Sequence, residues 1–109
     1  MPTTYKVLGQ VKPTAATATD LYTVPASTQA VISTFNISNL TNDPSVVRLS
    51  IRPAGAAQED KHYLIFNNQI GPFETLSYTV GITLAATDVV TVYDTAGKCA
   101  FNLFGSEIS

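Results

Sequence analysis

Two aspartates stand in nearly identical heptapeptides, ATDLYTV over residues 18–24 and ATDVVTV over residues 86–92. A pair of carboxylates is the usual machinery for acid–base chemistry on sugars, provided that a cleft with stacking aromatic rings holds the substrate. The sequence contains no Trp, and Thr-Asp pairs often accept hydrogen bonds from nearby backbone N–H groups in turns. We therefore expect Asp20 and Asp88 at strand entrances, facing solvent or bonded to local backbone, with neither acting as acid or base.

The other groups that could do chemistry are isolated along the chain. A nucleophile–histidine pair would have to use the single histidine, His62, with the single cysteine, Cys99, or with a serine. The same two residues cannot supply the usual ligands of a zinc ion. KHYLIF around His62 is typical of a strand and Cys99 begins an apolar run, so we interpret both as structural residues. Without a calcium loop or a glycine-rich phosphate loop, the sequence predicts no catalytic residue, no metal ligand and no cofactor.

Composition indicates one domain, residues 1–109, with a real core and few charges. Hydrophobic residues make up 45% of the chain and charged residues 13%. A small domain exposes much of its surface, which must here be built mostly from Thr, Ser, Asn, Ala and apolar groups. Such a surface suits lasting contact with other chains.

Charge and hydropathy exclude two classes of partner. The formal net charge is −2 and the six Lys and Arg residues are scattered, so we expect no direct contact with nucleic acid. No apolar stretch approaches the roughly 20 residues of a membrane-spanning helix, and no signal peptide is visible. We therefore expect no membrane partner. A single cysteine cannot form an internal disulfide, which is consistent with folding in a reducing compartment.

Period-two alternation of apolar and polar residues runs through most of the chain. In SVVRLSIRP, for example, Val47, Leu49 and Ile51 alternate with polar neighbours, as in a strand with one buried face. Turn-forming residues separate such runs and place strands near residues 4–11, 20–24, 29–38, 45–52, 61–66, 73–80, 88–93 and 98–104. This pattern predicts an all-β fold, an antiparallel β-sandwich of about eight strands, either jelly-roll or immunoglobulin-like.

Two segments depart from the alternation. Residues 53–63, PAGAAQEDKHY, are rich in Ala, and we expect a helical turn or a crossing loop there that connects the two sheets. Residues 1–19 begin as a strand and continue as a Thr/Ala run containing Pro13. They form either an edge strand followed by a long loop, or an edge strand with an N-terminal arm that lies on a neighbouring subunit.

Apolar side chains on outward faces are the remaining indication of function. If Val31, Phe35 and Ile37 face the core, Ile32 faces outward, and Phe104 and Ile108 near the C-terminus are similar candidates. On a domain with few charges, such groups either form a subunit interface or are covered by another segment of the same chain. Ile32, Phe104 and Ile108 are therefore the predicted interface residues.

Four segments in order carry a resemblance to a known type of protein. They are LYTVPASTQAVISTFNISN (21–39), IRPAGAAQEDKHYLIF (51–66), GITLAATDVVTVY (81–93) and FNLFGSEIS (101–109). They resemble small virion structural proteins of tailed bacteriophages, common in phages of aquatic bacteria, in which a LYTVP turn enters a Val-rich strand. The resemblance covers most of the chain and implies a virion protein with no enzyme activity and no cofactor. It offers no catalytic or ligand motif to carry over.

The resemblance leaves the place in the particle open. A chain with no stalk, collagen-like repeat or coiled coil fits a capsid decoration or cement protein best, and a tail, baseplate or fibre-attachment subunit is the alternative. A carbohydrate-binding module for the host surface is a third interpretation, which three tyrosines on one exposed face would favour. The expected partners are other virion proteins, either the major capsid protein or tail and fibre proteins, and further copies of the chain in a homo-oligomer. The expected location is the virion, after synthesis in the cytoplasm of the bacterial host.

Overall fold

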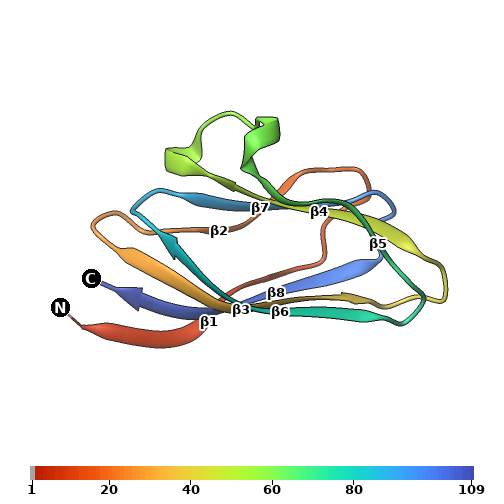
Figure 1. Ribbon diagram of the computed structural model, residues 1–109, viewed down its shortest axis with the longest axis horizontal. Coiled ribbons are helices and arrows are strands. Elements are labelled where there is room, and N and C mark those ends of the chain that lie inside the picture. Colours follow the sequence, from red (N-terminus) through yellow and green to blue (C-terminus); the bar gives the residue numbers. More distant parts are fainter. Residues whose placement is uncertain (1) are drawn as a thin grey trace.

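The computed structural model describes residues 2–109 as two four-stranded antiparallel sheets packed face to face, which confirms the predicted β-sandwich (Figure 1). Sheet A has the strand order β1-β8-β3-β6, and sheet B has the order β2-β7-β4-β5. The strands are β1 (Thr3–Val11), β2 (Thr19–Thr23), β3 (Gln29–Asn39), β4 (Ser45–Arg52), β5 (Tyr63–Ile70), β6 (Thr75–Leu84), β7 (Val89–Asp94) and β8 (Cys99–Ile108). All eight predicted strands are present, and β5, β6 and β8 continue further along the chain than predicted.

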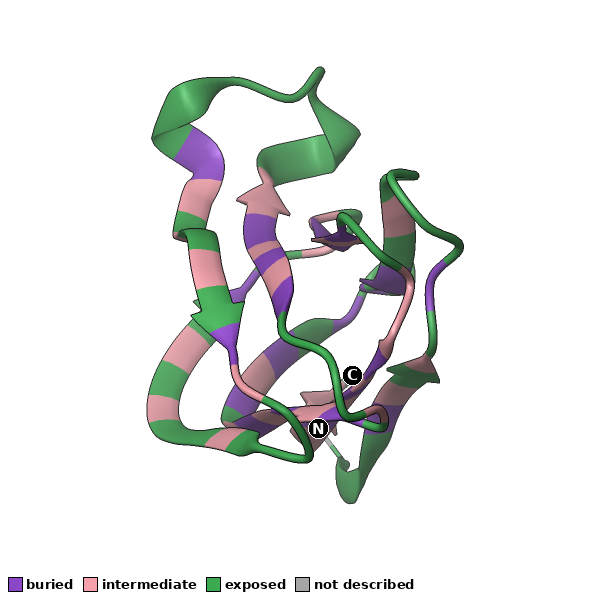
Figure 2. Cartoon of the chain, turned by 90° about the vertical axis from the view of Figure 1, so that its right-hand side faces the viewer, coloured by how far each residue is buried: buried purple, intermediate pink, exposed green. Residues whose placement is uncertain are grey.

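The core lies between the sheets and is formed by the side chains on the inner face of each sheet. Ile37, Phe101 and Leu103 from sheet A meet Val47 and Val90 from sheet B, and all five are almost fully buried. Buried stretches alternate with exposed ones along the strands in Figure 2. Each such side chain contributes about 1.5–3 kcal/mol on burial, so the alternation seen in the sequence is what holds the two sheets together.

The predicted outward orientation of Ile32 is wrong, because this side chain is only 1% exposed. The pairing of β3 with both of its neighbours shifts at Ser33, which has no opposite residue. Such a β-bulge breaks the alternation, so that Ile32 before it and Phe35 after it both face the core. Ile32 is therefore a core residue and offers nothing to a partner.

Residues 53–62 do not cross between the sheets, so the predicted sheet-to-sheet connection is wrong. They form two 3-10 helices, η1 (Pro53–Gly55) and η2 (Asp60–His62), between β4 and β5. These strands are paired neighbours in sheet B. Every other link between consecutive strands in residues 2–109 passes from one sheet to the other. The helical turn was predicted correctly, whereas sequence alternation carries no information on which strands become neighbours.

The segment before β2 is an edge strand followed by a loop. Strand β1 pairs with β8 along its length. The loop 12–18 then lies against the turn between β7 and β8, where the Ala16 N–H donates to the Asp94 carbonyl (2.9 Å) and Lys12 Nζ donates to the Gly97 carbonyl (2.6 Å). The edge strand and the loop thus both contact their own chain, and an arm that lies on a neighbouring subunit stays a prediction.

Asp94, the last residue of β7, is a buried carboxylate that holds the turn into β8. Its oxygens accept hydrogen bonds from the Ser45 hydroxyl and from the N–H groups of Ala96 (3.1 Å), Lys98 (2.8 Å) and Cys99 (2.7 Å). Burial alone would raise the pKa of this carboxyl, but the hydrogen bonds outweigh burial and lower it. Burial, and next the charge of Asp94, raises the pKa of the Cys99 thiol to about 12, so Cys99 stays protonated.

Replacing Asp94 by Asn should destabilise the domain, because an amide places N–H donors against backbone N–H groups. We expect Asp94→Asn to lower the free energy of unfolding at pH 7 by about 2–4 kcal/mol in urea denaturation. The folded pKa lies below the unfolded value of about 4, so the stabilisation is present above that pH and is lost as the pH falls through the folded pKa. The native chain should therefore lose stability below about pH 4 more steeply than the variant.

Asp60→Asn is the matched control, because Asp60 is exposed and its substitution should leave the stability within about 0.5 kcal/mol. If Asp94→Asn matched this control at pH 7 and kept the full acid dependence of the native chain, the role given to the Asp94 carboxylate would be wrong.

Gly105 is required by the close approach of β8 to the bulge in β3. A Cβ at Gly105 would lie 2.0 Å from the backbone oxygen of Val31, whereas a Cβ at Gly81 would meet nothing within 4 Å. We expect Gly105→Ala to cost on the order of 3 kcal/mol of stability and Gly81→Ala to be neutral or slightly stabilising. Thermal unfolding of the two variants compares them directly, and equal effects would contradict this account of the bulge.

Candidate interaction surface

The fold keeps Asp20 and Asp88 apart and gives each a structural bond. The two heptapeptides pair with each other as β2 and β7, antiparallel, so their aspartates lie toward opposite ends of the paired segment. Asp20 Oδ1 accepts from a terminal nitrogen of Arg52 (3.0 Å). Asp88, at the entrance to β7, accepts from the N–H groups of Ala54 (2.9 Å) and Ala85 (2.8 Å). Backbone bonding is confirmed for Asp88, and the predicted solvent-facing position is confirmed for Asp20, which also forms an ion pair with Arg52 of β4.

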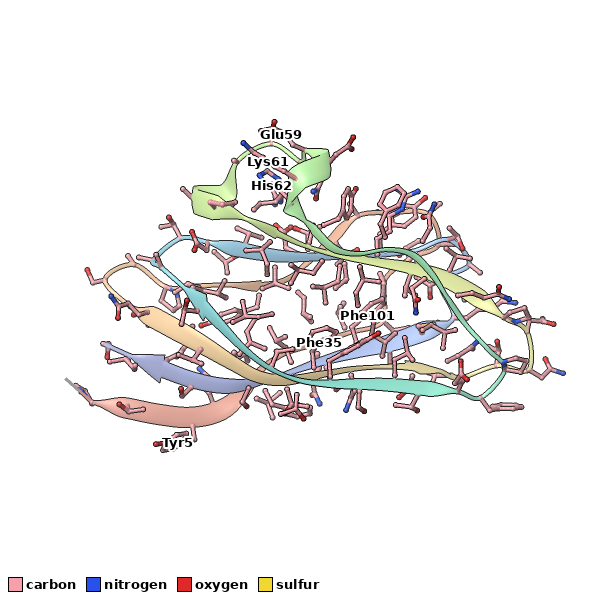
Figure 3. The ribbon with its side chains drawn as sticks, in the orientation of Figure 1. Tyr5, Phe35, Glu59, Lys61, His62 and Phe101 are labelled. Atoms are coloured by element: carbon pink, nitrogen blue, oxygen red, sulfur yellow. The ribbon has the colours of Figure 1, made fainter. Side chains whose placement is uncertain are left out.

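His62 and Cys99 also lie in different parts of the molecule. His62 is in η2, where its Nδ1 accepts from the N–H of Glu59 (3.1 Å), and Cys99 begins β8 inside the core. Figure 3 shows His62 beyond sheet B and Phe101, two residues after Cys99, between the sheets. Over residues 2–109 the structure holds no group of three or more His, Cys, Asp or Glu side chains that could bind a metal ion. No helix in this described part is long and apolar enough to cross a membrane.

The outer face of sheet A is free of charged side chains. Residues opposite each other on neighbouring strands share a face, so the strand pairing defines its members. They are Thr3, Tyr5, Val7 and Gln10 on β1; Ala100, Asn102, Phe104, Ser106 and Ile108 on β8; Gln29, Val31, Thr34, Asn36 and Ser38 on β3; and Thr75, Ser77, Thr79 and Thr83 on β6. Within residues 2–109, none of the six Lys and Arg or eight Asp and Glu residues belongs to this face.

Apolar side chains gather where β1 and β8 meet on the outer face of sheet A. Tyr5 is 84% exposed and Val7 is 47% exposed, and Val7 lies opposite Phe104. Tyr5 points away from sheet B in Figure 3. Two of the predicted interface residues, Phe104 and Ile108, are partly exposed members of this face. A large exposed Tyr among uncharged neighbours is characteristic of a protein contact.

Tyr5 and Val7 were not predicted as interface residues. In TYKVLGQV the apolar residues Tyr5, Val7 and Leu8 do not alternate cleanly, because the pairing of β1 with β8 shifts between Val7 and Gly9. Leu8 consequently faces the core. Lys6 lies between Tyr5 and Val7, and simple alternation would turn its charge outward and the two apolar side chains inward. The partner that holds Lys6 on the inner side, Glu107, is evident only in the fold.

The charges on the strands of sheet A are turned inward. Lys6 Nζ lies 3.1 Å from Glu107 Oε1, and the Tyr22 hydroxyl of sheet B donates to the other oxygen of that carboxylate. These contacts, the Tyr22 hydrogen bond first, lower the pKa of Glu107, and burial followed by the same hydrogen bond raises the pKa of Tyr22. The network ties the two sheets together and removes both charges from the outer face.

Polar side chains on the outer face of sheet A partly pair with one another. Gln10 donates to Asn102 at 2.9 Å across β1 and β8, and the hydroxyls of Ser38 and Thr75 lie 3.1 Å apart across β3 and β6. Groups already paired lose less hydrogen bonding to water when another surface covers them. The face can therefore be buried at a modest cost.

The outer face of sheet B differs in charge and in aromatic content. Arg48 lies over the rings of Phe66 (4.4 Å) and Tyr93 (4.7 Å), and Arg52 pairs with Asp20. Stacking on these rings stabilises the charged guanidinium of Arg48 while it remains in contact with water. This face suits solvent better than a dry contact.

Comparisons with known proteins do not assign either face. The chain matches no protein-family model, and no curated protein matches it. The interpretation of the outer face of sheet A therefore depends on its geometry and composition. It is uncharged, its apolar side chains adjoin one another, and its polar groups are partly paired.

Truncating an aromatic side chain should cost little stability on the outer face of sheet A and much stability in the core. Tyr5→Ser should change the free energy of unfolding by no more than about 0.5 kcal/mol, because the ring is exposed. Phe101→Ala should cost about 3–5 kcal/mol, because the ring is buried between the sheets. Chemical denaturation of both variants tests the assignment. A loss for Tyr5→Ser comparable to that for Phe101→Ala would show that Tyr5 supports the domain and is not held available for a partner.

Proposed function

We propose that the chain is a non-enzymatic structural subunit of a tailed-phage virion, a capsid decoration protein that docks through the outer face of sheet A. The observation that carries the proposal is the lack of charge on this face among residues 2–109, with Tyr5 and Val7 exposed on it. The resemblance of four ordered segments to virion structural proteins supplies the setting. In this proposal the chain is made in the host cytoplasm and joins the particle by contact with other virion proteins.

Docking of this kind gains free energy from apolar area. Burial yields about 25 cal/mol per Å² before the costs of association are subtracted. A large rigid side chain such as Tyr5 is a typical anchor, and an uncharged surface avoids the penalty of desolvating unpaired charges. Many copies on one particle then add weak contacts into stable attachment.

A tail, baseplate or fibre-attachment subunit would use the same surface, and only the place of the chain in the particle separates it from capsid decoration. Sugar recognition is disfavoured, because no three tyrosines within residues 2–109 share one exposed face. Tyr63 and Tyr93 lie near Phe66 and Arg48 on sheet B, and the other three are elsewhere. Tyr5 is on sheet A, Tyr22 lies between the sheets, and Tyr78 packs on Phe35. A sugar platform would need several of them together on one exposed face.

Adding one charge to the outer face of sheet A should weaken attachment. We expect Tyr5→Lys to reduce binding to capsids stripped of this chain by about 30-fold or more, because it removes an anchor and leaves a charge to desolvate. Co-sedimentation over a series of chain concentrations measures the effect. Thr23→Lys is the matched control, because it adds the same charge at an exposed position of sheet B.

The control variant should bind as the native chain does. Equal binding by Tyr5→Lys and the native chain, or failure of the native chain to bind either capsids or tails, would overturn the proposal. Circular dichroism confirms beforehand that both variants are folded.

A further inference from the structure

Three of the four edge strands carry features that hinder pairing with another chain. Strand β2 has only five residues. Strand β5 holds Asn67 at a positive φ of 52° and shifts register twice against β4. Strand β1 contains Lys6 and a register shift after Val7. Such short, kinked or charged edges protect a sandwich from unwanted association.

Strand β6 is the exception. It is ten residues long and reads TLSYTVGITL, without a charge or a proline. Its one neighbour within residues 2–109 is β3. Its pairing with β3 also shifts register, at Val80 and Gly81, which have no opposite residue on that strand. Because β6 is long and carries no charge, its free edge is still a template for an added strand.

The residues of β6 form a pattern that is symmetric about Thr79. Reading outward from Thr79 in either direction gives an apolar residue, a small residue, an apolar residue and a threonine. Antiparallel pairing of two copies about this position would place Tyr78 opposite Val80 and Leu76 opposite Ile82. Aromatic and branched side chains are favourable cross-strand pairs. The match extends over residues 75–83, nine of the ten residues of β6.

The inner side of β6 opens on an apolar groove between the two sheets. It is lined by Phe35, Leu64, Ile65, Tyr78, Val80 and Ile82. Leu64 on β5 is 53% exposed and Tyr78 on β6 is 39% exposed, so this side of the sandwich is incompletely covered. A second copy paired along β6 would present the same apolar residues to the groove.

We infer that β6 pairs with β6 of a second copy, antiparallel about a twofold axis at Thr79. The two A sheets then form one continuous eight-stranded sheet, and their uncharged outer faces become one surface. This inference goes beyond the proposed function, since the pairing requires no virion. A dimer built in this way would dock with two faces at once, which strengthens attachment by effective concentration.

Cysteine cross-linking tests both the pairing and its register. Opposite residues of an antiparallel pair have Cα atoms about 4.5–5.5 Å apart, within the range that a disulfide bridges. Thr79→Cys should therefore form a covalent dimer on mild oxidation. Thr75→Cys and Thr83→Cys should each stay monomeric on a non-reducing gel when oxidised alone, and should cross-link when mixed, because Thr75 lies opposite Thr83 in the proposed register. The native Cys99 is buried and should not react.

Sedimentation measures the pairing without cross-linking. The native chain and the Thr23→Lys control should sediment as dimers, and Thr79→Lys should sediment as a monomer, because it places two like charges on the axis. A native chain that is monomeric up to millimolar concentration, or Thr75→Cys that cross-links alone as well as Thr79→Cys does, would overturn the inference. Neither outcome would affect the docking face, because Tyr5 lies on β1, at the far edge of sheet A, and capsid binding is measured separately.

Discussion

Each strand of the sandwich can bury only one of its two faces, and this constraint decides where the chain places its charges. The inner face of sheet A takes the core residues together with the ion pair of Lys6 and Glu107, which leaves the outer face uncharged. Sheet B instead carries Arg48 and Arg52 on its outer face. The two layers therefore differ outwardly although they share one core. The proposed docking face follows from this asymmetry more than from any single residue.

The strands could be predicted from the sequence because burial of one face makes apolar and polar residues alternate with a period of two. This alternation can be recognised wherever strand pairing is regular. Prediction failed where pairing is irregular. The bulge at Ser33 turned Ile32 into the core, and the shift after Val7 obscured the outer face of β1. Phe104 and Ile108 do face outward as predicted, because β8 pairs with β3 without a bulge of its own. Strand neighbours, such as β4 and β5, depend on contacts across the molecule that no local pattern contains.

The two similar heptapeptides have a structural explanation. They are adjacent strands of sheet B, and their aspartates hold the segment that follows β4. Arg52 binds Asp20 and also donates to the carbonyls of Gly55 and Ala56, while Asp88 accepts from the backbone at Ala54. Both carboxylates thus fix η1 over the end of sheet B. Each aspartate therefore has a structural bond near the start of its strand, Asp20 through Arg52 and Asp88 directly to the backbone.

The orientation of the domain in its assembly decides whether the outer face of sheet A is the docking face. The most direct measurement is a cryo-electron microscopy reconstruction of the phage particle that carries the chain, at a resolution that distinguishes the two sheets. The outer face of sheet A, with Tyr5 buried in the contact, should lie against a neighbouring virion protein, and Arg48 on sheet B should face solvent. A reconstruction in which sheet B is buried against the particle and Tyr5 is open to solvent would contradict the account.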